Sequence, residues 1–288
     1  MSQTQADKLK EILNTKDDNH STKIITITSG KGGVGKSTIT ANLALMLSQM
    51  GYKVGIFDGD IGLANLDIIF NVRAKKTILD LLRGEALLSE VIIKINKNLI
   101  LIPGASGDEI LEYSNSKLIS KFLEEAEYLD VLDYLLIDTG AGISKTMQAF
   151  LSESDEVIVV TIPDPSAITD AYATIKVSSK FTKSVNLLLN MTKNEREGEL
   201  IYKKILKVAD SNINGLELSY FGSLVRDSVI STCSQKRALF VDEYPNSLSF
   251  FQLNEICRNI IAKLEHKLLT PTKRKSFTVL VRRLMDKF

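Results

Sequence analysis

A glycine-rich loop at residues 30–38, which reads GKGGVGKST, is the feature that most constrains the fold of this chain. Its spacing is that of a phosphate-binding P-loop, G-x-x-x-x-G-K-[ST], in which backbone N–H groups close around nucleotide phosphates because glycine presents no side chain. The β-rich run 24–28 precedes the loop, and residues 36–50 follow it with helical spacing up to Gly51. This strand–loop–helix context predicts a nucleotide-binding site rather than a glycine-rich turn without a ligand.

Two side chains of the loop have expected roles in phosphate chemistry. Lys36 is expected to reach the β- and γ-phosphates, and the Ser37 hydroxyl is expected to hold Mg²⁺. The predicted nucleotide-binding residues of the loop are Gly30, Lys31, Gly32, Gly33, Val34, Gly35, Lys36, Ser37 and Thr38.

The composition is that of an ordinary folded chain. Of its 288 residues, 44% are hydrophobic and 25% are charged, so disorder is not expected. Cys233 and Cys257 lie far apart and form no CxxC, which argues against a disulfide framework or a structural zinc site. No signal peptide opens the chain and no apolar run is long enough to cross a bilayer, so a cytoplasmic location is expected.

Residues 273–288 concentrate positive charge at the end of the chain. They contain six basic side chains and one acidic one, a net charge of +5, which leaves −4 on the rest of a chain whose total is +1. A mildly acidic body does not favour nucleic-acid binding, whereas a basic tail favours binding to an anionic surface.

From residue 22 onward, segments with strand and helix patterns alternate. The expected strands are 24–28, 54–58, 99–102, 134–138, 157–161, 185–190 and 218–221. The expected helices are 36–50, 77–83, 114–127, 143–151, 167–180, 196–209, 227–235 and 248–267. Most strand segments are continuous apolar runs, as in parallel strands covered on both faces. The pattern therefore predicts a three-layer α/β P-loop NTPase domain with a mostly parallel sheet.

The chain is expected to comprise a short helix (1–15), a polar linker (16–22), a nucleotide-binding domain (23–268) and an amphipathic tail helix (273–288). In the tail, apolar residues recur with the spacing of one helical stripe. They are Phe277, Leu280, Val281, Leu284, Met285 and Phe288. Such a basic helix can lie in a membrane interface, and two tails on a dimer would bind by avidity. The alternative is a helix packed on the protein's own core or on a partner, since periodicity does not show what the stripe faces.

Three carboxylates fall at the carboxyl ends of predicted strands, where doubly wound sheets bind their ligands. Asp58 and Asp60 close one strand, and Asp138 closes another. Phosphoryl transfer requires a metal and a positioned water, and carboxylates beside a P-loop can provide for both. Each aspartate alone could be a helix N-cap or a turn residue, but together with the P-loop the three favour a catalytic site.

Lys31, near the start of the loop, adds a second lysine to Lys36. This pair resembles the deviant Walker A motif of the MinD/ParA class of P-loop ATPases, and the resemblance covers about residues 22–265. It implies a homodimer that sandwiches ATP and Mg²⁺, in which Lys31 crosses the interface and contacts the partner's phosphates. Residues 58–67 are similar to the MinD form of switch I.

The same resemblance implies roles for the carboxylates. Asp60 matches the residue that orients the attacking water, and Asp58 matches a carboxylate in the outer shell of the metal. Asp138 matches the switch II aspartate that holds Mg²⁺ through water, and Gly142 matches a glycine near the γ-phosphate. The expected catalytic residues are therefore Lys31, Lys36 and Asp60, and the expected metal-binding residues are Ser37, Asp58 and Asp138.

The resemblance also implies contacts with the nucleoside. Asn190 ends a predicted strand where the family commonly places an adenine-contacting asparagine, and Asp227 matches a second base-contacting loop. This chain has Val225 where the family often has a proline in that loop. Asp164 matches an acidic residue that reaches the partner's ribose. Ordinary polar residues at strand ends are the alternative for Asn190 and Asp227, since such loops favour these residue types.

The N-terminal segment resembles the DQAxxLR element of the FlhG (YlxH/FleN) family, MinD-like ATPases that limit flagellar number and placement. The matching residues are Gln5, Ala6 and Leu9, and the departures are Thr4 and Lys10. The resemblance implies that this helix stimulates the GTPase FlhF. A frayed amphipathic chain end is the alternative.

Four functional interpretations follow. The leading one is an FlhG-type ATPase that dimerises on ATP and binds the inner face of the cytoplasmic membrane, with the cell pole as a candidate site. It acts through FlhF, with the flagellar switch complex or a transcriptional regulator as candidate partners. A MinD division-site regulator would lack the N-terminal extension. A ParA-type DNA-segregation ATPase would bind DNA, which the acidic body disfavours. An iron–sulfur scaffold ATPase needs a thiolate site that Cys233 and Cys257 do not provide.

Overall fold

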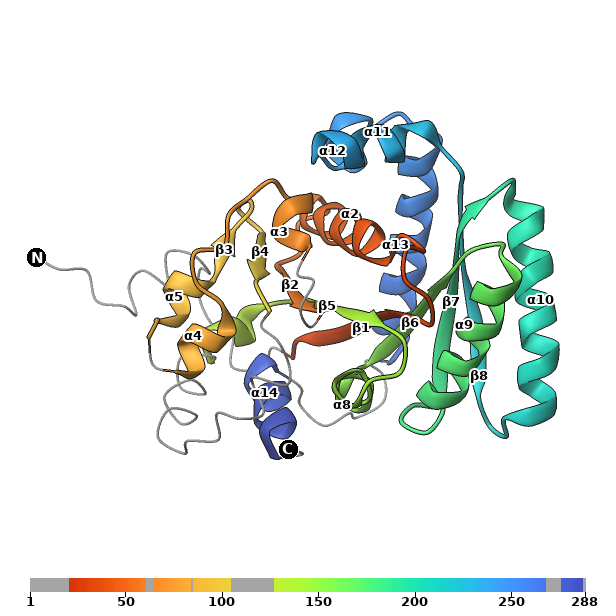
Figure 1. The fold of residues 1–288 in the computed structure, drawn as a ribbon, viewed down its shortest axis with the longest axis horizontal. Coiled ribbons are helices and arrows are strands. Elements are labelled where there is room, and N and C mark those ends of the chain that lie inside the picture. Colours follow the sequence, from red (N-terminus) through yellow and green to blue (C-terminus); the bar gives the residue numbers. More distant parts are fainter. Residues whose placement is uncertain (1–20, 61–64, 84, 105–126, 268–275, 287–288) are drawn as a thin grey trace, which may run out of the picture.

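The computed structural model describes residues 21–60, 65–83, 85–104, 127–267 and 276–286. The predicted helix 1–15, most of the predicted linker and most of the predicted helix 114–127 lie outside these residues. The described part is built around one eight-stranded sheet with helices on both of its faces (Figure 1). The strand order is β3-β4-β2-β5-β1-β6-β7-β8.

All neighbouring strands pair in parallel except β3, which runs antiparallel to β4. The strands are β1 (Lys23–Ser29), β2 (Val54–Gly59), β3 (Ile93–Lys94), β4 (Leu99–Ile102), β5 (Tyr134–Ala141), β6 (Glu156–Thr161), β7 (Ser184–Thr192) and β8 (Glu217–Val225). Every predicted strand is present, and the predicted α/β fold with a mostly parallel sheet is confirmed. The sequence did not predict β3, because two residues are too few to show an alternating pattern.

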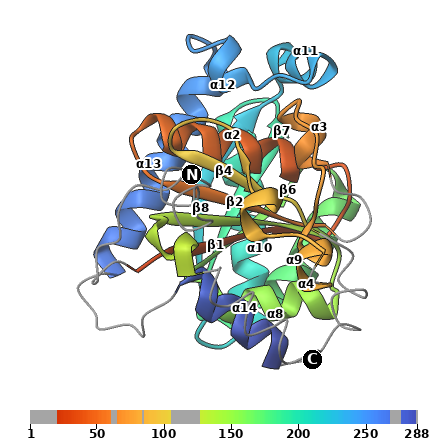
Figure 2. The same cartoon turned by 90° about the vertical axis from the view of Figure 1, so that its left-hand side faces the viewer.

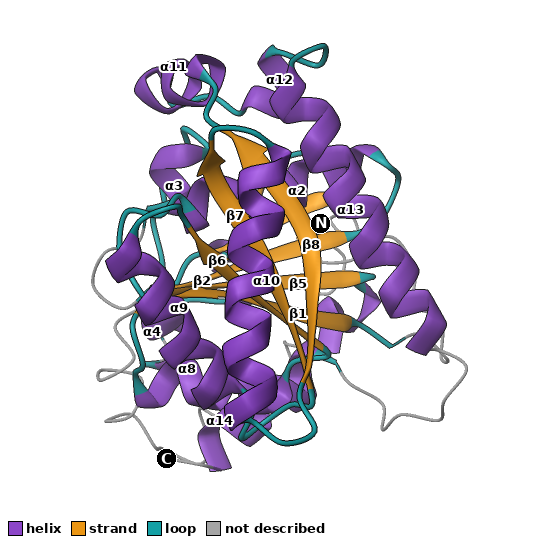
Figure 3. Cartoon of the chain, turned by 90° about the vertical axis from the view of Figure 1, so that its right-hand side faces the viewer, coloured by secondary structure: helices purple, strands orange, loops and turns teal. Residues whose placement is uncertain are grey.

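Figure 3 shows the sheet together with the helices around it. The longer ones are α2 (Lys36–Gln49), α8 (Lys145–Glu153), α9 (Pro165–Ser178), α10 (Glu195–Asn212), α11 (Ser228–Lys236), α13 (Leu248–Lys267) and α14 (Phe277–Asp286). The short ones are α3 (Leu66–Ile69), α4 (Ile78–Leu82), α5 (Leu88–Val91), α12 (Phe240–Glu243) and the 3₁₀ helix η1 (Glu127–Val131). Of the short helices, only α4 was predicted as a separate helix, because single turns carry no periodic signal.

The core has two sides because successive side chains of a strand point to opposite faces of the sheet. In β1, Ile25 and Ile27 pack in the cluster that also contains residues of α2 and α13, whereas Ile24 packs on the opposite face. On that second face, α8, α9 and α10 cover β6 and β7. Both faces are therefore apolar, which explains the continuous apolar runs in the sequence.

The strand order places the candidate site. β1 lies between β5 and β6, and the chain places β2 to β5 on one side of β1 and β6 to β8 on the other. Ligands of doubly wound sheets bind at such a switch point, beyond the carboxyl ends of the strands. These ends carry the P-loop after β1, Asp58 in β2, Asp138 in β5, Asp164 after β6 and Asn190 in β7.

The C-terminal helix α14 packs against the body, beside α8 and η1 (Figures 1 and 2). Leu280 and Val281 are 2% and 8% exposed and join the apolar cluster on this face of the sheet. The N–H and hydroxyl of Thr278 both donate to the Asp130 carboxylate at 3.2 Å, and Arg283 donates to Glu153 at 2.6 Å. α14 is thus held by both apolar and polar contacts.

This packing bears on the predicted membrane stripe. Leu280 and Val281 face the body in this arrangement, so they reach a membrane only if α14 leaves it. The side chains of the other stripe residues lie outside the described part: Phe277, Leu284, Met285 and Phe288. Membrane binding by the tail stays a prediction. None of the described helices combines the length and the apolar character that a membrane span needs.

Candidate nucleotide-binding site

The P-loop connects β1 to α2 in the conformation that its glycines permit. Gly33 and Gly35 have φ values of 77° and 88°, in the left-handed region that side chains disfavour. Gly35 is the N-cap of α2, so the first N–H groups of that helix lie at the end of the loop. Helix N-termini of this kind bind phosphates, because these N–H groups lack partners within the helix and the dipole favours negative charge.

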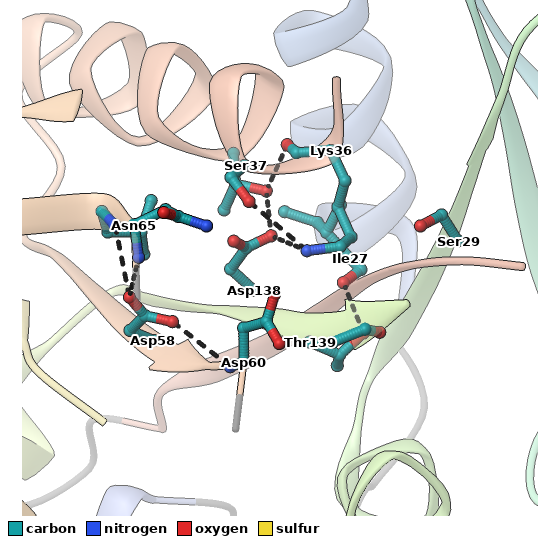
Figure 4. A network of polar contacts seen from close by, with 12 residues as sticks. Ile27, Ser29, Lys36, Ser37, Asp58, Asp60, Asn65, Asp138 and Thr139 are labelled. Carbon is teal, nitrogen blue, oxygen red and sulfur yellow. Dashed lines mark hydrogen bonds and ion pairs between the residues drawn. The ribbon is translucent and has the colours of Figure 1, made fainter. Parts of the chain in front are cut away.

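Lys36, Ser37 and Asp138 lie close together at the end of the sheet (Figure 4). Lys36 Nζ lies 2.8 Å from Asp138 Oδ1 and 3.5 Å from the Ser37 hydroxyl, and the two charged side chains are only 7% and 1% exposed. Thr40 also donates to Asp138 Oδ1, at 3.1 Å. Thr40 is not among the residues predicted for the site, although it lies one helical turn after Lys36 and thus on the same face of α2.

Asp58 and Asp138 are direct neighbours in the sheet, since β2 and β5 pair them in register. Asp58 is 2% exposed and accepts hydrogen bonds from the N–H groups of Asp60, Asn65 and Leu66 at 3.2, 3.2 and 3.3 Å (Figure 4). Burial, and then repulsion from Asp138, raise the pKa of Asp58 from 3.8 to about 6. The pKa of Asp60 is raised as well, mainly by burial, although the Lys36 charge opposes this.

The residues present suit a nucleotide with Mg²⁺. Ser37, Asp58 and Asp138 offer the hydroxyl and carboxylate oxygens that Mg²⁺ prefers, and the loop offers N–H groups to phosphates. Within the described residues, no group of three or more histidine, cysteine, aspartate or glutamate side chains is arranged to hold a metal alone. Mg²⁺ usually keeps several waters and binds through one or two carboxylates plus substrate phosphates, so this site needs no cage made of protein alone.

Lys31 is directed toward α9 and not toward Asp138. Its Nζ lies 3.1 Å from Asp164 Oδ1 and 2.6 Å from the Ser166 hydroxyl. Asp164 is also the N-cap of α9, because its side chain accepts from Ala167 N at 3.0 Å. This backbone hydrogen bond, with those from Ser166 and Lys31, lowers the pKa of Asp164 to about 2. The cap, followed by a proline at the first helical position, explains why α9 begins earlier than predicted.

The predicted base-contacting residues are held by their own chain. Asn190 Nδ2 donates to the carbonyl of Val34 in the P-loop at 2.8 Å. Asp227 is the N-cap of α11, where one carboxylate oxygen accepts from Val229 N at 2.9 Å and the other from the Ser249 hydroxyl at 2.7 Å. Ser249 is not among the predicted residues, because only the packing of α13 brings it to Asp227.

Of the remaining predicted residues, Gly142 lies near the site and the three partner residues lie outside the described part of the chain. Gly142 has a φ of 86°, and its N–H donates to the carbonyl of Ser29 at 2.9 Å, which ties the end of β5 to the end of β1. Gln5, Ala6 and Leu9, the predicted partner residues, lie outside the described residues.

The raised pKa of Asp58 predicts a pH-dependent stability. A carboxyl with a folded-state pKa above its unfolded value binds more protons when folded, so its stabilising contribution is full below pH 3.8 and is lost as the pH rises through about 6. Asp58→Asn removes this titration. We expect the unfolding free energy of the variant, relative to wild type, to increase by about 2–3 kcal/mol from about pH 4 to about pH 7. Urea denaturation across this range measures it, and a difference independent of pH would contradict the raised pKa.

Comparison with known proteins places this site in a family. Residues 20–261 match the ParA family, described as NUBPL iron-transfer P-loop NTPase. The chain is 48% identical over 268 residues to the flagellum site-determining protein YlxH of Helicobacter pylori, and the match covers 91% of both chains. It is 31% identical to the antiactivator FleN of Pseudomonas aeruginosa, over 84% of this chain and 87% of FleN.

Solved structures agree with these relatives. The cell division ATPase MinD of Pyrococcus furiosus has a TM-score of 0.67 at 26% identity, with 84% of this chain and 99% of that chain covered. The septum site-determining protein MinD of Pyrococcus horikoshii, complexed with Mg-ADP, also has a TM-score of 0.67 at 26% identity, over 85% and 98% of the two chains. The chain therefore belongs to the ParA family of P-loop NTPases and, within it, to the MinD-like branch that includes the flagellum site-determining protein YlxH.

Proposed function

We propose that this protein is an ATPase that dimerises on ATP, binds the cytoplasmic membrane and controls the number or placement of flagella. The observation that carries the proposal is a complete P-loop with a buried Lys36–Asp138 ion pair, in a chain 48% identical to a flagellum site-determining protein. ATP and Mg²⁺ would be the cofactors, and ATP hydrolysis the reaction.

Each part of the site has a role in this proposal. The N–H groups of the loop and Lys36 would hold the β- and γ-phosphates, and Ser37 and Asp138 would hold Mg²⁺, which neutralises the charge of the phosphates. Asp60 would orient the attacking water. A Cβ built on Gly140 would lie 3.0 Å from Asp60 Oδ1. The Asp60 carboxylate therefore lies directly beside the end of β5 that follows Asp138.

The position of Lys31 supports the dimer. Its side chain is 42% exposed and pairs with Asp164, which is equally exposed. Water screens an exposed ion pair of this kind, so the contact does not prevent Lys31 from moving away from Asp164. A lysine at this place can leave Asp164 and contact the phosphates of a nucleotide bound to a second copy of the chain.

Three substitutions separate binding, dimerisation and turnover. Lys36→Ala should abolish ATP binding, because it removes the phosphate contact and leaves Asp138 without its partner charge. Lys31→Ala should bind ATP but remain monomeric. Asp60→Ala should bind ATP and dimerise, with hydrolysis at least about a hundredfold slower. Nucleotide titration measures ATP binding, light scattering measures dimerisation, and phosphate release measures hydrolysis. Wild-type hydrolysis by Asp60→Ala would rule out the mechanism.

The tail supports membrane binding. α14 carries Arg282 and Arg283, and the tail beyond the described helix is basic as well. Each basic residue near an anionic leaflet contributes on the order of 1 kcal/mol. Since Leu280 and Val281 pack on the body, docking of α14 and insertion into a membrane would compete for the same apolar side chains.

Glu153→Gln tests this competition without altering the tail. The substitution breaks the ion pair with Arg283 and should weaken docking, so binding to phosphatidylglycerol vesicles should strengthen by roughly 3- to 10-fold. Glu199→Gln, at an exposed site on α10, makes the same charge change and should have no such effect. Vesicle co-sedimentation measures the binding. Equal effects of the two substitutions would contradict docking as the competitor, and a wild type that never binds vesicles would contradict the membrane proposal.

The cellular role is proposed from the relatives. YlxH of Helicobacter pylori is named a flagellum site-determining protein, and it matches over 91% of this chain. The N-terminal segment with Gln5, Ala6 and Leu9 would stimulate the GTPase FlhF, as its resemblance to the FlhG element implies. This part of the proposal depends on sequence alone.

The cellular proposal is tested by counting flagella per cell with electron microscopy after deletion of the gene in the source organism. We expect excess or misplaced flagella that the wild-type gene corrects and the Lys36→Ala gene does not. Unchanged flagella with misplaced septa would instead indicate a MinD-type division regulator. Anucleate cells would indicate a ParA-type DNA-segregation ATPase. Either result would leave the ATPase chemistry in place and reassign its role.

A further inference from the structure

Asn190, near the end of β7, reaches the P-loop from a neighbouring strand. We infer that it is a positioning residue: its amide fixes the peptide unit between Val34 and Gly35, so that the Gly35 N–H faces the phosphates of the bound nucleotide whatever its base. The inference rests on the proposed binding of ATP. It assigns Asn190 a role in phosphate binding, where the sequence predicted a contact with adenine.

Both polar atoms of the Asn190 amide are engaged by main-chain groups. Nδ2 donates to the Val34 carbonyl at 2.8 Å, and Oδ1 accepts from Met191 N at 2.9 Å. Asn190 is 5% exposed and Val34 is 1% exposed, so water does not readily replace these bonds. Only one orientation of the amide presents a donor to the carbonyl and an acceptor to the N–H, so the partners fix which atom is which.

The Val34 carbonyl determines the direction of the next N–H group. In a trans peptide unit the C=O and the N–H point in opposite directions. Because the carbonyl is held on Asn190, the Gly35 N–H points away from Asn190 and toward the phosphate side of the loop. Gly35 is the N-cap of α2, and free N–H groups at helix N-termini bind phosphates. Without the bond from Nδ2, this peptide unit could rotate and present its carbonyl oxygen to the phosphates.

Asn190 lies against two residues with unusual backbone conformations. Gly35 has a φ of 88°, and a Cβ there would lie 2.3 Å from Asn190 Nδ2. Met191 has a φ of 56°, which is uncommon for a residue with a side chain, and its N–H donates to Asn190 Oδ1. One side chain thus contacts two residues with positive φ, Gly35 in the P-loop and Met191 near the end of β7. A contact with the base alone would require neither.

Tripolyphosphate distinguishes the two roles, since it has the phosphates of ATP and no base. We expect Asn190→Ala to raise the Kd for ATP and for tripolyphosphate by the same factor, about tenfold, as for one lost buried hydrogen bond. Asn190→Asp keeps the acceptor for Met191 but lacks the donor for Val34, so it should weaken both ligands at least as much. Displacement of a fluorescent ATP analogue from the full chain, with Mg²⁺, measures each Kd.

The buried Asn42 of α2 offers a matched control. Its Nδ2 donates to the Thr38 carbonyl at 2.8 Å and its Oδ1 accepts from Val241 N at 3.2 Å, so Asn42→Ala loses the same kinds of bonds. Asn42→Ala should lower the thermal unfolding midpoint and leave both Kd values within about twofold of wild type. Thermal unfolding without ligand shows that each variant is folded. If Asn42→Ala weakened both ligands as much as Asn190→Ala, the effect would be general loosening and the inference would be wrong.

The remaining outcomes are also decisive. Loss of affinity for ATP with wild-type affinity for tripolyphosphate would overturn the inference and establish a base contact. Unchanged affinity for both ligands in Asn190→Ala would overturn it as well. A wild type that binds neither ligand would overturn the proposed function, and the inference with it. That failure is distinguished from the others because it is measured on the wild type alone.

Discussion

The ion pair between Lys36 and Asp138 is the contact on which the candidate site depends. It joins the first turn of α2 to β5 at 2.8 Å, with both side chains almost wholly buried. Because a buried charge without a partner costs several kcal/mol, each of these two side chains needs an opposite charge beside it, and in this structure they provide it for one another. Asp58 adds a second buried carboxylate beside Asp138, and its pKa is raised first by burial and then by repulsion from Asp138. A divalent cation would balance this negative charge.

The end of β5 also connects the nucleotide site with the C-terminal helix. After Asp138 the chain passes through Gly142, which is bonded to Ser29 at the end of β1, and enters α8. α8 ends with Glu153, the partner of Arg283 in α14. Any movement of residues 138–142 that displaces α8 therefore changes the surface against which α14 packs. The fold brings the proposed catalytic and membrane-binding elements into one continuous set of contacts.

The sequence predicted the parts of the site that follow from local pattern. The P-loop, the parallel sheet and the placing of Asp58 and Asp138 at strand ends all follow from motif spacing and apolar runs. The pairing of Asp58 with Asp138 could not be predicted, because β2 and β5 are distant in sequence and their register is set by the sheet. Thr40 and Ser249 were missed for related reasons, since only packing shows which carboxylate a hydroxyl meets.

The sequence by itself determined what each segment can do: a glycine-rich loop can bind phosphates, and a basic amphipathic helix can bind an apolar surface. The tertiary structure decided which partner each segment has. It turned Leu280 and Val281 toward the body, Lys31 toward Asp164, and Asn190 toward the P-loop. The physical reason is that periodicity and motif spacing are local, whereas hydrogen bonds and burial depend on contacts between residues that are far apart in the chain.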